Sequence, residues 1–168
     1  MAKGNKSGSA GQDPNNRTVA SNRRARRDFN ISETFECGLV LRGSEVKSLR
    51  EASVQIAEAY ARVQHGELWL YNLHVAPYSH SGAAMGHDPD RRKKLLVHRA
   101  EIEKVHKATE VDGLTLVPLS LYFKNGKAKI ELGIARRIKK ADMRQEIAKR
   151  DAARDAEREL GRRNKYGG

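Results

Sequence analysis

Cysteine, aromatic residues and long apolar runs are all scarce in this chain of 168 residues. The one cysteine, Cys37, can form no internal disulfide, which fits a reducing compartment. Because aromatic residues make up only 5% of the chain, we predict an aliphatic core. No apolar run approaches the roughly eighteen residues of a membrane span, and the N-terminal segment lacks the apolar core of a secretory signal. These absences predict a soluble, cytoplasmic protein without a membrane partner.

Motifs for catalysis and metal binding are missing as well. No stretch resembles a phosphate-binding glycine loop, a nucleophile elbow or a catalytic pair of carboxylates, so we predict no enzymatic activity. The histidines form no i, i+4 pair and have no paired cysteines beside them, which predicts neither a metal site nor a cofactor. They are His65, His74, His80, His87, His98 and His106.

What the chain does have is positive charge, concentrated at its two ends. The formal net charge is +12, and residues 1–27 and 136–168 each contribute +6. Residues 28–135 hold fourteen cationic and fourteen anionic side chains, so the centre is neutral. Basic segments are attracted to a polyanion because binding releases its counterions. Nucleic acid is therefore the first candidate partner.

The hydrophobic pattern between the basic ends predicts a mainly β protein. Residues 35–41 have the composition of a strand, and Ser44 is the expected N-cap of a helix that follows. Two hairpins are predicted at His65-Gly66 and Asn125-Gly126, since both dipeptides favour the positive φ of tight turns. The segment "RRKKLLVHRAEIEKVHKA", residues 91–108, has roughly helical apolar spacing and predicts one or two short helices.

Closing a set of hairpins on itself removes exposed sheet edges. The predicted fold is therefore a small closed antiparallel barrel of the oligonucleotide-binding (OB) type, with about three short flanking helices. We expect residues 1–21 to form a disordered basic arm, residues 22–137 the barrel, and residues 138–168 a C-terminal tail. Good helix formers fill the tail without a continuous apolar stripe, so it is predicted to be disordered when free and helical when bound.

Two basic motifs stand out from the charge background. In "NRRARRDF", residues 22–29, four arginines crowd into five positions, and guanidinium groups suit phosphate because they donate to two oxygens at once. A solubilising charge run is the alternative explanation. "RRKKLLVHR", residues 91–99, would place four cations at a helix start against the helix dipole, which suggests a polyanion partner.

A lone carboxylate, Glu36, lies in the predicted strand beside this positive charge. A strand glutamate is most often simply solvent-facing. Near arginines it could instead fix their geometry, or accept hydrogen bonds from base amino or sugar hydroxyl groups. Charge alone does not choose between these roles.

Several stretches, in order, resemble the successive signature blocks of one family, the SsrA-binding proteins (SmpB). They are "NRRARRDFNI", "TFECGLVLRGSEVKSLR", "RRKKLLVHR", "LVPLSLYFKNGKAKI" and "RDAARDAERE", and the resemblance covers about residues 22–151. It implies an OB-like protein that binds the tRNA-like domain of transfer-messenger RNA (tmRNA). Such a protein delivers tmRNA to the vacant A site of a stalled ribosome for trans-translation. The chain is expected to act as a monomer.

The candidate contacts follow from the resemblance and from charge. The resemblance implies RNA contacts at Asn22, Arg24, Arg26, Glu36, Lys94 and Leu96. The basic motifs and the helix after Glu36 add Arg23, Arg27, Lys47, Arg91 and Lys93. For the tail, the expected partner is 16S rRNA at the small-subunit decoding region. Its candidate contacts are Arg136, Lys139, Lys140, Asp142, Arg144, Lys149, Arg150 and Arg154.

The tail departs from the family pattern at Arg137, Ile138, Ala141 and Met143, while Asp142 remains. A second interpretation also stays open, namely a generic OB-fold protein that binds single-stranded RNA or associates with ribosomes. Such a protein binds bases by stacking them on exposed aromatic side chains. The candidates for that role are Trp69, Tyr71, Tyr122 and Phe123.

Overall fold

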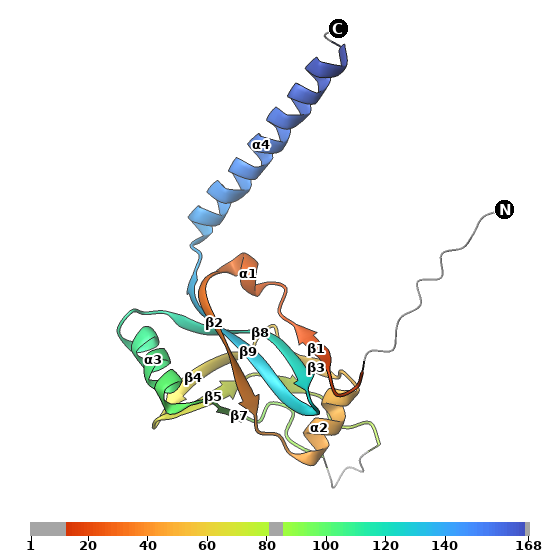
Figure 1. The fold of residues 1–168 in the computed structure, drawn as a ribbon, viewed down its shortest axis with the longest axis vertical. Coiled ribbons are helices and arrows are strands. Elements are labelled where there is room, and N and C mark those ends of the chain that lie inside the picture. Colours follow the sequence, from red (N-terminus) through yellow and green to blue (C-terminus); the bar gives the residue numbers. More distant parts are fainter. Residues whose placement is uncertain (1–12, 81–85, 167–168) are drawn as a thin grey trace, which may run out of the picture. The chain divides into compact units, whose positions relative to one another are not determined.

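The computed structural model describes residues 13–80 and 86–166, and within these ranges the chain is mainly β (Figure 1). The strands are β1 (Arg17–Ser21), β2 (Phe29–Leu39), β3 (Val54–Gln55), β4 (Tyr60–Gln64), β5 (Glu67–Tyr71), β6 (His74–Val75), β7 (Lys93–Leu96), β8 (Thr115–Lys124) and β9 (Lys127–Arg137). The helices are α1 (Ala25–Asp28), α2 (Gly43–Arg50), α3 (Arg99–Glu110) and α4 (Lys140–Tyr166). The chain divides into two compact units between Arg136 and Arg137. The predicted mainly β class is confirmed.

The strand pairings of the first unit close into a ring. Seven strands form one sheet in the order β1-β8-β4-β5-β7-β2-β9, and β9 also pairs with β8. The pairings therefore run from β8 through β4, β5, β7, β2 and β9 and back to β8. β1 lies outside this ring, antiparallel to the second half of β8, and β3 and β6 form a separate pair. A ring of pairings leaves its members no unpaired edge that could recruit another strand.

Both predicted hairpins are confirmed. His65 and Gly66 connect β4 to β5 with φ of 50° and 73°, and Asn125 and Gly126 connect β8 to β9 with φ of 51° and 76°. Two successive residues with positive φ produce the turn whose twist matches that of the flanking strands. Each turn fixes the register of the hairpin that it closes, and hence which side chains face outward.

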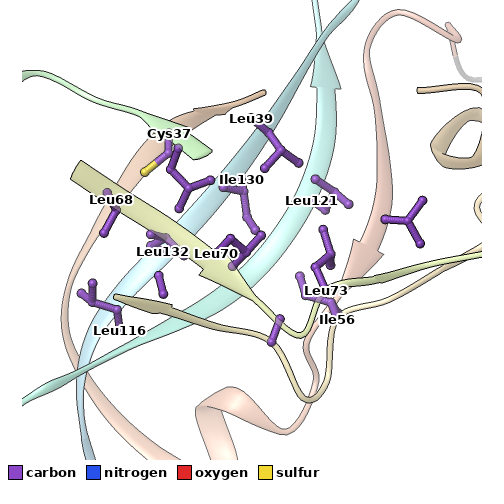
Figure 2. Close-up of a cluster of buried hydrophobic side chains, with 14 of the residues drawn as sticks. Cys37, Leu39, Ile56, Leu68, Leu70, Leu73, Leu116, Leu121, Ile130 and Leu132 are labelled. Carbon is purple, nitrogen blue, oxygen red and sulfur yellow. The ribbon is translucent and has the colours of Figure 1, made fainter. Parts of the chain in front are cut away.

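The core inside the ring is aliphatic, as predicted. Alternate residues of the strands point into it, among them Leu68 and Leu70 of β5 and Ile130 and Leu132 of β9, and all four are fully buried. Figure 2 shows these side chains gathered with Cys37 and Leu39. The odd-numbered residues of β5 point the other way, because successive side chains in a strand face opposite sides. The ring therefore has a buried inner face and a partly exposed outer face.

Two predicted boundaries are wrong. The disordered arm does not extend to residue 21, because Arg17–Ser21 pairs with β8 as β1. The rest of the predicted arm, residues 1–12, lies outside the described residues. Residues 93–96 form strand β7 where a helix was predicted, and α3 begins at Arg99. The apolar spacing in this segment belonged to a strand followed by a helix, which meet at Val97 and His98.

The second unit contains helix α4, which agrees with the helix preference of its sequence. Its apolar side chains Ile147 and Leu160 are 55% and 62% exposed. The helix therefore gains little from apolar packing, and its predicted fraying in the absence of a partner stays a prediction. None of the helices in the described ranges combines the length and apolar character that a membrane crossing needs.

Candidate nucleic-acid interface

The arginine run, Arg23, Arg24, Arg26 and Arg27, lies on and just before α1 with all four side chains exposed. Two neighbours hold it in place. Ala25 is 1% exposed and packs among Val117, Leu119 and Ala135. The Asn22 backbone N–H donates to the carbonyl of Leu119 at 2.8 Å, and its side-chain amide donates to that of Pro118 at 3.0 Å. The arginines therefore project from a short helix fixed to β8.

Asn22 itself has a different place from the one predicted. Its side chain is 9% exposed, and its amide is used in the bond to Pro118. Its Oδ1 atom is buried and has no hydrogen-bond partner within the described ranges. Asn22 thus positions α1 and exposes little surface for a direct contact with RNA.

Glu36 lies on the outer face of β2 and is partly exposed. Tyr122 donates a hydrogen bond to its Oε2, and the Lys124 ammonium lies 3.6 Å from its Oε1. The bond from Tyr122 lowers the pKa of Glu36 below its ordinary value, and the charges of Lys124 and Lys129 add to this effect against the opposing influence of burial. Glu36 is therefore an ionised acceptor at neutral pH.

The partners of Glu36 decide one of the open alternatives. In the part of the chain that the structure describes, its hydrogen-bond and ion-pair partners are a tyrosine and a lysine of β8. The alternative in which Glu36 fixes the geometry of an arginine is therefore not the arrangement in the structure. Tyr122 lies opposite Lys129 in the β8–β9 hairpin. Glu36, Lys129 and Tyr122 therefore come from three neighbouring strands, β2, β9 and β8. Each carboxylate oxygen has further lone pairs, which could accept from an RNA donor.

The second basic motif begins with four cationic residues, 91–94. Some of their side chains point inside the ring of strands and others point outside it. Lys93 is 0% exposed, and its ammonium donates to the carbonyls of Leu73 and Arg91 at 3.1 and 2.7 Å. Burial lowers the pKa of Lys93, and the nearby charge of Glu45 opposes that shift. The prediction that Lys93 contacts RNA is wrong, because its ammonium cannot reach solvent.

Glu45 is the carboxylate that neutralises the buried positive charge of Lys93. Its side chain is 0% exposed, with one oxygen 3.7 Å from the Lys93 ammonium and both oxygens bound by the Arg91 guanidinium. The backbone N–H of Arg42 also donates to it at 2.8 Å. Burial acts to raise the pKa of Glu45, but the hydrogen bonds from Arg91 and Arg42 and the charges of Arg91 and Lys93 together outweigh it, so the pKa is lowered. Glu45, Arg91 and Lys93 are called the buried ion cluster below.

The buried ion cluster changes two predictions. Arg91 was expected to bind phosphate, but its fork of donors is occupied by Glu45. Ser44 was expected to cap α2, but the helix begins at Gly43, and Glu45 receives the backbone N–H of Arg42. The Ser44 hydroxyl instead lies 3.0 Å from Nδ1 of His87, which is 7% exposed.

Lys94 and Leu96 point outward from β7, as the predicted RNA contacts would require. The Lys94 ammonium pairs with Glu67 at 2.9 Å, and Leu96 is 55% exposed although it is apolar. Leu96 lies opposite Gly38 of β2, where an added Cβ would come within 3.2 Å of the Leu96 Cβ. Glycine at position 38 therefore leaves room for the Leu96 side chain across the strand pair.

A groove of about 410 Å³ opens beside Leu96. Its lining includes the apolar side chains of Leu39, Val46 and Phe123, and Lys127 and Lys129 of β9. Sequence reasoning missed these two lysines, and it missed Tyr122 and Lys124 as neighbours of Glu36. Part of the signal was present, because a two-residue turn at Asn125-Gly126 places Tyr122 opposite Lys129.

The remaining predicted contacts are solvent-facing. Lys47 is exposed on α2, with its ammonium 5.6 Å from the centre of the Tyr78 ring. Arg136, near the end of β9, is exposed as well. In the second unit the exposed candidates are Lys139, Lys140, Arg144, Lys149, Arg150 and Arg154. The side chain of Asp142 lies outside the described residues.

The sequence model of the SmpB protein family matches residues 19–162. The chain belongs to the SmpB family. An SsrA-binding protein of Frankia casuarinae is 51% identical over 149 residues, which cover 89% of this chain and 93% of that protein. One of Mycobacterium sp. (strain KMS) is 51% identical over 162 residues, covering 95% and 96%. An SsrA-binding protein of Halothermothrix orenii is 49% identical over 156 residues, covering 93% and 99%.

A solved structure also resembles this SmpB-family chain. It is described as "tmRNA-SmpB: a journey to the center of the bacterial ribosome", and one of its chains aligns with a TM-score of 0.60 and 48% sequence identity. The alignment covers 72% of this chain and 85% of the other. Sequence and fold therefore agree on the family.

Proposed function

We propose that this protein binds the tRNA-like domain of tmRNA and delivers it to the vacant A site of stalled ribosomes for trans-translation. The observation that carries the proposal is the outer face of β2, β7 and β8, together with the exposed arginine run on and before α1. This face combines an ionised acceptor held by Tyr122, an exposed Leu96 and unburied cations, on a chain of the SmpB family. Membership of the SmpB family agrees with the solved tmRNA–SmpB structure that this chain resembles. The proposed role is that of an RNA-binding protein acting in the cytoplasm.

The ring of strand pairings supports an OB-like barrel as the scaffold of this surface. In such barrels the outer side chains of a few adjacent strands contact the nucleic acid. The RNA contacts proposed on this scaffold, after the correction for buried side chains, are Arg23, Arg24, Arg26, Arg27, Glu36, Lys47, Lys94 and Leu96.

The second unit has the separate role of contacting the ribosome. Its helix presents many cations and few large apolar side chains, so phosphate contacts with 16S rRNA would supply the free energy that orders it. The proposed ribosome contacts are Arg136, the last residue of the first unit, and Lys139, Lys140, Asp142, Arg144, Lys149, Arg150 and Arg154 of the second, with Asp142 taken from the family resemblance.

A competition assay tests the first role. Labelled tmRNA bound to the protein is displaced with unlabelled tmRNA, with tRNA or with random single-stranded RNA at two salt concentrations. We expect tmRNA to compete best at both. Equal competition by all three would instead favour a generic single-strand binder.

Truncation after Arg137 tests the second role, because it leaves β9 complete. The shortened protein should keep its affinity for tmRNA and lose the tagging of stalled chains in a reconstituted translation system. Loss of tmRNA binding, or full tagging activity, would contradict this division between the two units.

A further inference from the structure

The outer face of β4 and β5 carries an aromatic pair. Tyr60 and Tyr71 lie directly opposite each other in the hairpin, and their rings stack with centroids 5.4 Å apart and an angle of 15° between planes. Tyr60 is 41% exposed. These rings belong to the outer face, so the aliphatic core does not require them. Exposed aromatic side chains are unusual in a chain with so few aromatic residues.

Cations surround the neighbouring Trp69 on the same face. Trp69 lies between Arg62 of β4 and Lys94 of β7 in the strand register, and the guanidinium carbon of Arg92 lies 4.3 Å from the centre of one of its rings. Glu67 is the carboxylate on β5 beside them, and it pairs with Lys94. Positive charge therefore exceeds negative charge around the tryptophan.

We propose that this face is a second RNA-binding surface, which takes unpaired nucleotides by stacking their bases and binding their phosphates. We call it the stacking platform, formed by Tyr60, Arg62, Trp69, Tyr71, Arg92 and Lys94. Aromatic rings and guanidinium planes stack with any base, while nearby cations follow the phosphates. The platform takes unpaired nucleotides because the bases of a duplex are already stacked on one another.

The charge of the platform favours RNA over a protein partner. A protein–protein interface is usually depleted of charged residues at its centre, whereas here cations flank the central Trp69. The platform also adjoins the proposed tmRNA interface, since Leu96 of β7 pairs with Gly38 of β2. The inference goes beyond the proposed function, because it concerns any RNA that offers unpaired nucleotides and does not depend on tmRNA.

Intrinsic fluorescence gives a direct test, because Trp69 is the only tryptophan in the chain. The full-length protein is titrated with a single-stranded RNA of about twelve nucleotides, and then with the same sequence as a duplex. We expect the single strand to quench Trp69 emission at lower concentration and to a greater extent than the duplex. Absence of quenching, equal quenching by both RNAs, or RNA binding without a change in emission would overturn the proposal.

Variants identify the contacts. Tyr60→Ala should weaken binding of the labelled single strand about tenfold, as expected for loss of one stacking partner. Arg62→Gln should lower the slope of log affinity against log salt by about 0.7, the value for one phosphate contact. Arg99→Gln is the matched control, since it removes the same charge from a 93% exposed side chain on α3. Unchanged affinity in a folded Tyr60→Ala protein, checked by circular dichroism, would also overturn the proposal.

The outcome is separable from that of the proposed function. Glu36→Gln should weaken tmRNA binding and leave the quenching of Trp69 by the oligonucleotide unchanged. If the competition assay fails to favour tmRNA while quenching persists, the stacking platform stands and the ribosome-rescue role falls. If tmRNA is favoured and quenching is absent, the ribosome-rescue role stands and the stacking platform falls.

Discussion

Two basic segments that look alike in the sequence have opposite roles in the structure. The arginine run projects from a short helix into solvent, and its anchors are neutral groups of α1 and β8. Residues 91–94 divide, because Arg91 and Lys93 turn toward Glu45 while Lys94 faces outward. A run of cations therefore indicates nothing about RNA until the position of the nearest carboxylate is known.

The difference follows from the cost of burying charge. Burying an ammonium without a partner costs roughly several kcal/mol of solvation free energy. Lys93 can therefore lie inside only because Glu45 and two backbone carbonyls surround its ammonium. Beneath the arginine run the buried residues are Asn22 and Ala25, and the ion pair of Arg27 with Asp28 lies at the surface. Four predictions test this comparison.

The largest effect is expected from breaking the buried ion cluster. Glu45→Ala leaves Lys93 and Arg91 buried or half-buried without their carboxylate, which should lower the free energy of unfolding by about 3–5 kcal/mol. Urea unfolding followed by circular dichroism measures it. Glu33→Ala is the control, because Glu33 belongs to an exposed pair with Lys104, and its loss should cost no more than about 1 kcal/mol. Equal losses for both variants would contradict the structural role of Glu45.

The second effect concerns the arginine run, and it should appear in the affinity for tmRNA and not in the stability of the fold. Replacing all four arginines with Gln should lower the slope of log tmRNA affinity against log salt by about 0.7–0.9 per lost phosphate contact. Unfolding by urea should be unchanged, since the four side chains are exposed. Lys93→Met sharpens the comparison, because removing a buried cation should leave the salt slope as it was. An unchanged slope in the quadruple variant would place the RNA surface elsewhere.

Substitution of Glu36 should weaken tmRNA binding by an intermediate amount. Glu36→Gln is expected to weaken tmRNA binding by about 1–3 kcal/mol, as loss of a charge-assisted hydrogen bond would. Tyr122→Phe, which keeps the ring and removes the donor that holds Glu36, should have a smaller effect in the same direction. A solvated strand glutamate predicts the opposite for Gln, namely slightly tighter binding at two salt concentrations, because negative charge is removed from a basic surface.

The smallest effect concerns pH. The pKa of Glu45 is lower in the folded protein than its ordinary value of 4.5, so the unfolded chain takes up the proton first as the pH falls. Ionised Glu45 therefore stabilises the fold above about pH 4.5, and this contribution is lost as the pH drops through the folded pKa. Stability measured from pH 7 to pH 3 should fall less steeply in Glu45→Ala than in the unaltered chain. Parallel curves would show that Glu45 does not contribute.

Local signals in the sequence predicted the local parts of this fold. The hairpins at His65-Gly66 and Asn125-Gly126 were predictable because their turn conformations depend on two residues each. The aliphatic core and the mainly β class followed from composition and alternation. The outward direction of Lys94 and Leu96 came from the family resemblance.

Long-range contacts account for what was missed. Tyr122 and Glu36 are 86 positions apart, and Arg91 and Glu45 are 46 apart, so no local pattern could pair them. β1 was missed because its short polar strand is stabilised by pairing with β8, about a hundred residues later. Residues 93–96 were assigned to a helix because four residues are too few for periodicity to separate helix from strand.

The buried ion cluster has a consequence for how β7 finds its place. The sequence of β7, "KKLL", offers one lysine and one leucine to each face of the strand. Shifting it by one residue would exchange Lys93 and Leu95 for Lys94 and Leu96 and leave the composition of both faces the same. Hydrophobicity therefore cannot choose between the two alignments.

Glu45 makes the alignments unequal. In the observed one, the ammonium of Lys93 reaches the Glu45 carboxylate and the carbonyls of Leu73 and Arg91. Only this alignment leaves Lys94 and Leu96 on the outer face, where the proposed tmRNA interface and the stacking platform both use them. A carboxylate that never meets solvent thus selects which lysine does, and the RNA-facing chemistry of the strand depends on a choice made in the core.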